Sequence, residues 1–510
     1  MSSDSRKQGE EVMMLRSEEL RLNKEEFFTQ TFCSIFHKTA LRYPDKTAVK
    51  DMVGEFSYRE LDEYSNFLAK HLIAQGVGQE DIVAIQSGRQ KESILAMLAI
   101  WKAGAAYVFV DDSYPPARMD VMQRECGYRI IFTEKYFESL VWERDEEFIN
   151  YSKRDGLAIL VYTSGSTSAP KGVMIEHKNV TASISNFHRL GFCETDRTCV
   201  FASFSFVASV YDIFSQLAAG GALIIIPEEI RRNIDLIAKF WMENQITVTF
   251  LPPHMAMKFM QFDDSKFSLR VLLVGSEPVR NLEPKSYRII NVYAASEMCS
   301  LISTYEIKSA QKSYPIGKLN ETIRGYIVDE DGNQVKPGEE GELWLAGPQV
   351  TRGYFKRPEL TKAQYMKNPF SDEKEYERLF KTRDIVCQME DGNLKYISRK
   401  DNMFKIRGFR VEGGAVESAI LKCTAIKEVV VKAFADQGGC NILCGYFVAE
   451  GEVDVKEVKE KLKEIIPYYM VPTCLIRVDQ FPRNRNNKID RNAIQPPKEL
   501  NDHKMLKKLY

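Results

Sequence analysis

The sequence predicts an α/β protein: a large N-terminal domain of layered sheets and helices, and a small α+β C-terminal domain. Apolar runs of strand length alternate with amphipathic helical stretches from about residue 30 to about residue 395, which is typical of α/β layers. A chain of 510 residues is also too long for one core. After Ile397 the composition turns basic, and residues 398–402 form a polar connection. We therefore expect domains of residues 1–400 and 401–510.

Each expected element follows from its local pattern. Short apolar runs bounded by polar residues predict strands, and longer amphipathic stretches predict helices. The turn at Asp331-Gly-Asn before an alternating stretch predicts a β-hairpin. The expected strands are residues 82–85, 157–161, 222–226, 429–434 and 443–448, the expected helices are 92–102, 234–243 and 455–465, and the hairpin lies at 338–345.

Composition excludes several classes of function. Lysine and arginine number 70 and aspartate and glutamate 71, so the net charge of −1 gives no electrostatic footprint for nucleic acid. The first eleven residues are polar and charged, unlike a signal peptide, and no apolar run is long enough to span a membrane. The ten cysteines are scattered, and the pair Cys440 and Cys444 has no histidine or second pair nearby. We expect reduced thiols in a cytoplasmic protein, without a zinc site.

The most informative segment is the loop of residues 162–172, Tyr-Thr-Ser-Gly-Ser-Thr-Ser-Ala-Pro-Lys-Gly, which follows the apolar run at 157–161. Its hydroxyl groups, backbone N–H groups and single lysine could hold a polyphosphate. It is not a Walker A loop, because Pro170 stands where the second glycine would be and Gly172 stands where a Mg²⁺-binding serine or threonine would follow Lys171.

This loop resembles the phosphate loop of adenylate-forming enzymes, which include acyl-CoA synthetases, luciferases and the adenylation domains of nonribosomal peptide synthetases. Further motifs of that superfamily occur in order over nearly the whole chain, and their residues are most similar to those of the peptide-synthetase branch. They are Phe-Ser-Tyr-Arg-Glu-Leu at 56–61, Lys-Ala-Gly-Ala-Ala-Tyr-Val-Phe-Val-Asp at 102–111, Asn-Val-Tyr-Ala-Ala-Ser-Glu at 291–297, Gly-Glu-Leu-Trp-Leu-Ala-Gly at 341–347, Arg-Gly-Tyr at 352–354, Lys-Thr-Arg-Asp at 381–384, Arg-Lys-Asp-Asn-Met-Phe-Lys-Ile-Arg-Gly at 399–408, Pro-Tyr-Tyr-Met-Val-Pro at 467–472 and Asn-Asn-Lys-Ile-Asp-Arg at 486–491.

The resemblance implies an ATP site with Mg²⁺ as its metal. In the superfamily the loop holds the outer phosphates, a tyrosine stacks on adenine, a hydroxyl residue contacts the α-phosphate, a glutamate helps to hold Mg²⁺, and an aspartate assisted by an arginine binds the ribose. By position, the ATP-binding residues are Thr163, Ser164, Gly165, Ser166, Thr167, Lys171, Tyr293, Ser296, Asp384 and Arg399, and the metal ligand is Glu297.

Two further roles are implied for the C-terminal domain. Lys488 matches the catalytic lysine, whose charge would offset the repulsion between the substrate carboxylate and the α-phosphate. Asp401 matches the hinge about which the small domain rotates between an adenylation pose and a thioester-forming pose. Gly408 lies in the stretch that would face the thiol in the second pose. Arg383 replaces the usual glycine before the ribose aspartate.

The acid-binding pocket departs from the family pattern at Val207. The family has an aspartate there that pairs with the α-ammonium of an amino acid, and burying an ammonium against valine would cost several kcal/mol. We expect an aryl, keto, hydroxy or short acyl acid unless another carboxylate, with Glu277 the nearest candidate, reaches in. The carried-over pocket residues are Phe206, Val207, Ala208, Tyr211, His254, Leu272, Val274, Val292, Ser300 and Leu301, of which Leu272 and Val274 could be displaced by one residue.

The function that the resemblance implies is ATP-dependent activation of a carboxylic acid as an acyl-adenylate with release of pyrophosphate. The acyl group would then pass to the phosphopantetheine thiol of a carrier protein. Two alternatives stay open: an acid:CoA ligase that uses free CoA, and a nucleotide-binding relative without catalysis. We expect a module that is either free-standing or part of a larger synthetase.

Overall fold

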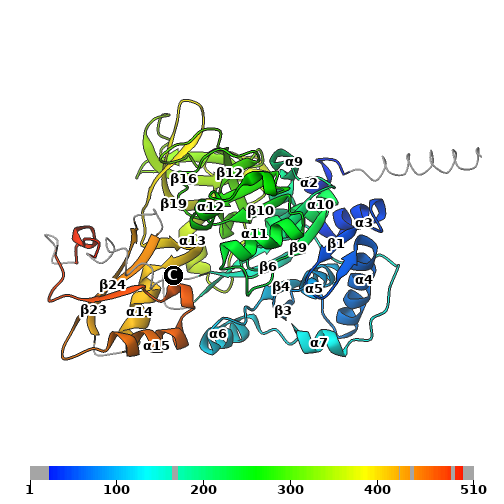
Figure 1. Cartoon of the computed structure of the whole chain (residues 1–510), viewed down its shortest axis with the longest axis horizontal. Coiled ribbons are helices and arrows are strands. Elements are labelled where there is room, and N and C mark those ends of the chain that lie inside the picture. The colour runs from blue at the N-terminus through cyan, green and yellow to red at the C-terminus, as the bar shows by residue number, and fades with distance from the viewer. Residues whose placement is uncertain (1–21, 164–169, 424–425, 437–440, 484–488, 498–510) are drawn as a thin grey trace, which may run out of the picture.

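The computed structural model describes residues 22–163, 170–423, 426–436, 441–483 and 489–497. Three large sheets with covering helices make up the bulk of this chain, and a smaller group of strands and helices follows at the C-terminal end, coloured orange to red in Figure 1. The predicted α/β class is confirmed. The boundary of the two domains at residue 400 stays a prediction.

The largest sheet contains strands that line the candidate site described below. Within the described residues it has nine strands in the order β14-β13-β12-β11-β10-β8-β9-β1-β2. Strands β10, β11 and β12 are parallel, so their carboxyl ends lie along one edge. The strands are β1 (Thr47–Lys50), β2 (Glu55–Ser57), β8 (Arg197–Val200), β9 (Ala222–Ile225), β10 (Val248–Leu251), β11 (Val271–Gly275), β12 (Arg288–Ala295), β13 (Ser300–Glu306) and β14 (Lys318–Leu319).

Two other sheets carry the strands that flank the predicted phosphate loop and the strands that hold the predicted ribose-binding residues. One has the order β17-β7-β6-β4-β3-β5, and the other β15-β16-β19-β18 with β20 paired to β19. Their strands are β3 (Ile82–Gln86), β4 (Ala106–Phe109), β5 (Ile131–Thr133), β6 (Leu157–Thr163), β7 (Lys171–Glu176), β15 (Arg324–Val328), β16 (Glu340–Ala346), β17 (Gly353–Tyr354), β18 (Tyr365–Lys367), β19 (Arg378–Gln388) and β20 (Leu394–Arg399).

Helices fill the space between and around these sheets. The helix α4 begins with a capping box, in which Ser57 Oγ accepts the Glu60 N–H and the Glu60 carboxylate accepts the Ser57 N–H. The helices are α2 (Glu26–Thr29), α3 (Phe32–Arg42), α4 (Tyr58–Ala74), α5 (Lys91–Lys102), α6 (Pro116–Cys126), α7 (Glu134–Ser139), α8 (His177–Ile184), α9 (Phe187–Leu190), α10 (Ala208–Ala219), α11 (Ile234–Glu243), α12 (Pro253–Phe259) and α13 (Pro358–Gln364). Among the described residues, no helix is long and apolar enough to cross a membrane.

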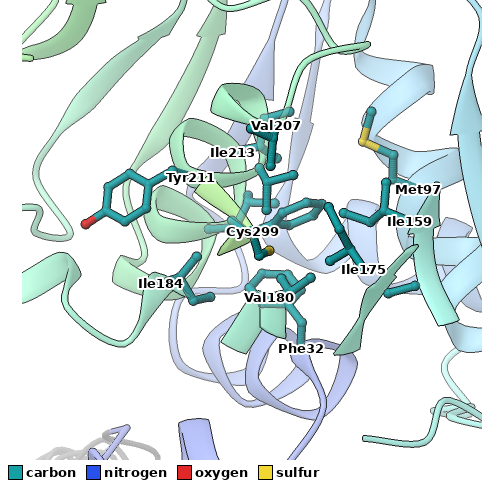
Figure 2. Close-up of a cluster of buried hydrophobic side chains, with 14 of the residues drawn as sticks. Phe32, Met97, Ile159, Ile175, Val180, Ile184, Val207, Tyr211, Ile213 and Cys299 are labelled. Atoms are coloured by element: carbon teal, nitrogen blue, oxygen red, sulfur yellow. The ribbon is translucent and has the colours of Figure 1, made fainter. Parts of the chain in front are cut away.

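The main core joins the nine-stranded and six-stranded sheets through α3, α5, α8 and α10. Figure 2 shows part of it, where Phe32 of α3, Ile175 of β7, Val180 of α8 and Ile213 of α10 lie close together. Since α10 belongs to this core from its first turn to its last, the pocket residues that begin this helix are fixed by packing.

The C-terminal part has its own core. A hairpin of β21 (Met403–Ile406) and β22 (Phe409–Glu412) leads into helix α14 (Gly413–Cys423) and the sheet β23-β24-β25. Helix α15 packs on α14, and buried residues such as Val416, Val431 and Leu462 hold these elements together. The bounds are β23 (Ile426–Ala435), β24 (Asn441–Ala449), α15 (Val455–Ile465) and β25 (Cys474–Arg477).

The local expectations are confirmed with small shifts at the ends. The strands expected at 82–85 and 157–161 are β3 and β6, the helix expected at 92–102 is α5, and α11 and α15 have the predicted bounds. In the expected hairpin segment, β16 pairs with β15 across the turn at residues 329–333. The periodic segments were predictable because their apolar faces meet the cores described above.

One buried ion pair ties α4 to α5. The Lys102 side chain is fully buried, and its Nζ donates to Asp62 Oδ1 and to Asn66 Oδ1, each at 2.6 Å. Burial lowers the pKa of Lys102, and the Asp62 carboxylate opposes that shift. The pair therefore holds two charges inside the core that each need the other.

Lys102→Met should destabilise the protein by about 3–5 kcal/mol, because the substitution leaves the Asp62 carboxylate buried without its main counter-charge. Lys70→Met is the matched control on α4, since Lys70 is an exposed partner of Asp145 and Glu147 and should cost at most about 1 kcal/mol. Urea unfolding followed by tryptophan fluorescence measures both variants. Equal losses would show that the Lys102–Asp62 pair contributes no more than a surface pair.

A second buried charge makes stability depend on pH. Loss of hydration raises the pKa of Asp212 in α10 from 3.8 to about 7, although the Ala202 N–H and Arg89 act in the opposite direction. Between these two values the unfolded chain releases a proton that the folded chain keeps, so stability falls as pH rises from about 4 to about 7.

Asp212→Asn should remove this loss, because the amide has nearly the same shape and does not ionise. The melting temperature of the variant minus that of the wild type should therefore become more positive between pH 4.5 and pH 8, as measured by scanning calorimetry. A difference that is flat or becomes more negative over this range would mean that Arg89 keeps the Asp212 carboxylate charged in the folded state.

Candidate active site

The phosphate loop joins two paired strands. Thr163 ends β6 and is the partner of Lys171, which begins β7. The predicted residues Ser164, Gly165, Ser166 and Thr167 lie outside the described residues. Thr163 Oγ1 is buried and has no hydrogen-bond partner within the described chain, so its hydroxyl is available at the base of the loop.

Lys171 points to the centre of the site. Its Nζ lies 4.5 Å from the centre of the Tyr354 ring and 3.8 Å from Glu297 Oε1, and the side chain is almost fully buried. Burial, together with the charge of Arg410, lowers the pKa of Lys171 to about 8 despite the nearby Glu297. An anionic phosphate close to this amine would favour its charged form.

Glu297 is a fully buried carboxylate in the 3₁₀ turn η2 (Ser296–Met298) that follows β12. Its Oε1 accepts hydrogen bonds from Arg410 Nη1 and from the Tyr354 hydroxyl, both at 2.8 Å. Burial opposes ionisation, but Arg410 and Lys171 hold the pKa of Glu297 down to about 2. Oε2 is buried without a partner in the described part of the chain. A second cation would fit at this oxygen.

The predicted ribose-binding residues contact the predicted adenine-binding tyrosine. Asp384 of β19 is the register partner of Arg399 of β20, and Arg399 Nη1 donates to Asp384 Oδ1 at 2.5 Å. The Tyr293 hydroxyl, at the end of β12, also donates to Asp384. Arg383 holds a φ of +63°, a conformation that explains why the family prefers glycine there.

The predicted hinge residue lies beside this motif. Asp401 accepts hydrogen bonds from Arg399 Nε at 2.8 Å and Arg399 Nη2 at 3.0 Å. Arg399 therefore bridges the carboxylates of Asp384 and Asp401, one in the large domain and one at the start of the hairpin. The hinge role of Asp401 stays a prediction.

A cavity of about 200 Å³ connects these groups to an apolar pocket. Tyr293, Ser296, Glu297, Asp384 and Arg399 line it. It is also lined by seven of the predicted acid-binding residues, which are Phe206, Val207, Ala208, Tyr211, Val292, Ser300 and Leu301. Val207 and Tyr211 stand one turn apart at the start of α10, as Figure 2 shows.

Three predicted pocket residues lie elsewhere. Leu272 and Val274 face the opposite side of β11, where they join a core with Trp241 and Phe259, and Leu273 lines the cavity instead. Successive residues of a strand alternate between faces, so a displacement of one residue exchanges the whole set. His254 of α12 is not among the lining residues, and burial lowers its pKa to about 4.

Behind the pocket, Cys299 lies between η2 and β13 and belongs to the main core (Figure 2). The residue is fully buried, and loss of hydration raises the pKa of its thiol. Its neighbour Ser300 lines the cavity.

The hairpin β21–β22 closes the cavity from the C-terminal side. Its residues Lys405, Arg407, Gly408, Phe409 and Arg410 all line the cavity. Lys405 Nζ lies 5.5 Å from the centre of the Tyr293 ring.

Sequence reasoning assigned Arg410 no role at Glu297, and it did not place Asp212 in the pocket. The close spacing of the basic residues Lys405, Arg407 and Arg410 was a signal that this segment carries charge to a site. Asp212 also lines the cavity, and its Oδ2 has no partner within the described residues.

Lys488 lies outside the described residues. On either side of that gap, Arg483 and Ile489 pair in an isolated β-bridge, and Arg491 binds Glu417 of α14 at 2.6 Å. None of these three flanking residues lines the cavity.

Comparison with known proteins agrees with this architecture. Residues 36–355 match the family model described as AMP-binding enzyme, and residues 415–488 match the AMP-binding enzyme C-terminal domain. The chain is 33% identical over 481 residues to bacitracin synthase 1 of Bacillus licheniformis. The matched region covers 91% of this chain but only 9% of that protein.

Two solved structures have a similar fold. An artificially fused adenylation–PCP di-domain peptide synthetase, NpsA-ThdA from Klebsiella oxytoca, has a TM-score of 0.78 at 24% identity and covers 88% of this chain and 93% of that one. The four-domain peptide synthetase AB3403, bound to AMP and glycine, has a TM-score of 0.65 at 28% identity and covers 94% of this chain and 37% of that one. With its family model matched over most of its length, the chain belongs to the AMP-binding enzyme family.

Proposed function

We propose that this protein activates a carboxylic acid with ATP, forming an acyl-adenylate and pyrophosphate, and then transfers the acyl group to the phosphopantetheine thiol of a carrier protein. The observation that carries the proposal is a cavity lined both by the predicted nucleotide residues Tyr293, Asp384 and Arg399 and by apolar residues that include Val207. An acid bound in that pocket could place its carboxylate next to the α-phosphate of ATP.

In the first half-reaction a carboxylate oxygen attacks the α-phosphorus of ATP, and the bond to the pyrophosphate oxygen breaks. The protein's contribution is alignment and charge stabilisation. Asp384 would accept the ribose hydroxyls, Ser296 would contact the α-phosphate, and Lys171 and Thr163 would hold the outer phosphates together with Ser164, Gly165, Ser166 and Thr167.

The donor set fits Mg²⁺ if the phosphates supply most of its ligands. Within the described residues, no group of three or more His, Cys, Asp or Glu side chains gathers to hold a metal. Glu297 Oε2, buried and without a partner there, is one suitable oxygen, and Mg²⁺ often takes one carboxylate plus phosphate oxygens. When bound, the ion would neutralise charge on the phosphates. Arg410 occupies Oε1 of the same carboxylate in this pose.

In the second half-reaction a thiolate attacks the acyl carbon, the thioester forms, and AMP leaves. The pose described here supports assigning the hairpin to this step, because the hairpin lines the cavity whereas the described neighbours of Lys488 do not. Lys488 would reach the α-phosphate after rotation about Asp401, which agrees with the two-pose scheme expected from the sequence and with domains of residues 1–400 and 401–510.

A carrier protein is preferred to free CoA as the acceptor. Bacitracin synthase 1 is described as a synthase, and NpsA-ThdA is described as an adenylation–PCP di-domain. The chain spans only a small part of such synthases, so its carrier could lie on the same chain or on another one.

Lys488→Ala should abolish ATP–pyrophosphate exchange while ATP still binds. Loss of a transition-state cation corresponds to roughly a 10²–10³-fold lower rate. A panel of aryl, keto, hydroxy, acyl and amino acids first identifies the best substrate by exchange, and ATP binding is measured by calorimetry. Wild-type protein without exchange on any acid would refute the proposed function, and a variant within a few-fold of wild type would refute the role of Lys488.

The panel also tests the acid pocket. Because Val207 offers an ammonium no counter-charge, ordinary α-amino acids should be activated at least about tenfold less well than the best acid without an α-ammonium, a difference of about 1.4 kcal/mol.

Val207→Asp should shift the preference toward the amino analogue, and Val207→Asn, of similar shape but uncharged, is the matched control. Strong exchange by the wild type with one α-amino acid, and none with its deaminated analogue, would instead indicate that Asp212 or Glu277 pairs with the ammonium.

A further inference from the structure

The tip of the β21–β22 hairpin is held against the large domain by a hydrogen bond to Glu277. The Gly408 N–H donates to Glu277 Oε1 at 2.7 Å. Arg407 and Gly408 both have positive φ, +52° and +85°, which is the geometry of a type I′ turn between two strands. Such a turn directs its backbone N–H groups outward at a fixed angle, so the acceptor must lie at one defined place.

The large domain is built to present this acceptor. Strand β11 ends at Gly275, where a Cβ would lie 2.2 Å from the Val292 carbonyl oxygen, and Ser276 then takes a φ of +70°. This turn places Glu277 beyond the edge of the sheet. A Cβ at position 408 would lie 3.1 Å from Ser276 Oγ, so the turn fits closely against this segment.

Aromatic packing fixes the same hairpin from the side. The Phe409 ring stacks on Tyr469 at 4.1 Å, within the C-terminal part, and meets Phe206 of the large domain edge-on at 5.1 Å. These contacts hold the hairpin near the pocket, but they are not directional enough to set the position of its tip. The hydrogen bond to Glu277 supplies that direction.

The electrostatic setting explains why this carboxylate faces the hairpin. Glu277 is half-buried, and loss of hydration raises its pKa to about 7, while the Gly408 N–H, Lys405 and the Arg407 N–H and charge all oppose the rise. Every stabilising partner named here belongs to the hairpin. When the hairpin leaves, Glu277 loses them together, so its charge favours the docked pose.

We propose that Glu277 is a positioning residue for the thiol-transfer half-reaction alone, because it accepts the Gly408 N–H and so sets the hairpin tip at the mouth of the cavity. The inference rests on the proposed function. Glu277 does not touch Tyr293, Asp384 or Lys171, and it does not line the cavity. Glu297, in contrast, serves the nucleotide site and also binds Arg410.

The test separates the two half-reactions. The substrate is the acid that gives the fastest exchange, and the thiol is pantetheine. Glu277→Ala should lower the rate of thioester formation at least tenfold and leave ATP–pyrophosphate exchange within about twofold of wild type. Glu277→Gln keeps an acceptor oxygen and should recover part of the transfer rate. Glu283→Gln, an exposed acid in the same segment, is the matched control and should change neither rate.

A second measurement does not depend on any substrate. Hydrogen exchange of residues 403–412 in the free protein should be faster in Glu277→Ala than in wild type, while the strands of the nine-stranded sheet keep their protection. Faster hairpin exchange in a protein that activates no acid would support the docking contact even if the proposed function fails.

Three results would overturn the inference: equal losses in both half-reactions, wild-type transfer by Glu277→Ala, or unchanged hairpin exchange. A selective loss of exchange with an amino acid in Glu277→Gln would make Glu277 a substrate-binding residue instead.

Discussion

The site depends on one carboxylate that has no contact with water. Glu297 is fully buried, and an isolated charge there would be very costly, so the surrounding structure must supply cations and donors. Lys171 comes from β7, Tyr354 from β17 and Arg410 from the hairpin, and they converge on a residue at the end of β12. The need to compensate this one charge therefore relates the six-stranded sheet, the nine-stranded sheet and the C-terminal part to one another.

The fold was largely predictable because its strands and helices have strong hydrophobic periodicity. Residues 234–243 and 455–465 form helices with the expected bounds, and the run at 157–161 forms the buried strand β6. Pairing between distant strands could not be read from periodicity. The adjacency of β19 and β20, which joins Asp384 to Arg399, was accessible only through the resemblance of the motifs to those of a known family.

The grouping of residues in the candidate site was predictable where a motif fixes both residue type and position, as for Tyr293, Glu297 and Asp384, which all line the cavity. Prediction was less accurate where the sequence does not show which face of a strand points into the cavity. Leu272 and Val274 of β11 were expected to line it, but they join the core on the other face, and Leu273 lines the cavity. The contacts of Arg410 and Gly408 were also out of reach, because they join segments more than a hundred residues apart and exist only in one arrangement of the hairpin. A linear pattern carries little information about such contacts.

The burial of Cys299 has a consequence for chemical selectivity. An acyl-adenylate is an electrophile, and any reactive sulfur beside it would compete with the intended acceptor and leave the enzyme acylated on itself. Cys299 directly precedes a cavity-lining residue, yet it is fully enclosed, and its raised pKa keeps the sulfur protonated and weakly nucleophilic. The same packing that shapes the back of the pocket would thus keep this sulfur away from an acyl-adenylate formed in the proposed reaction.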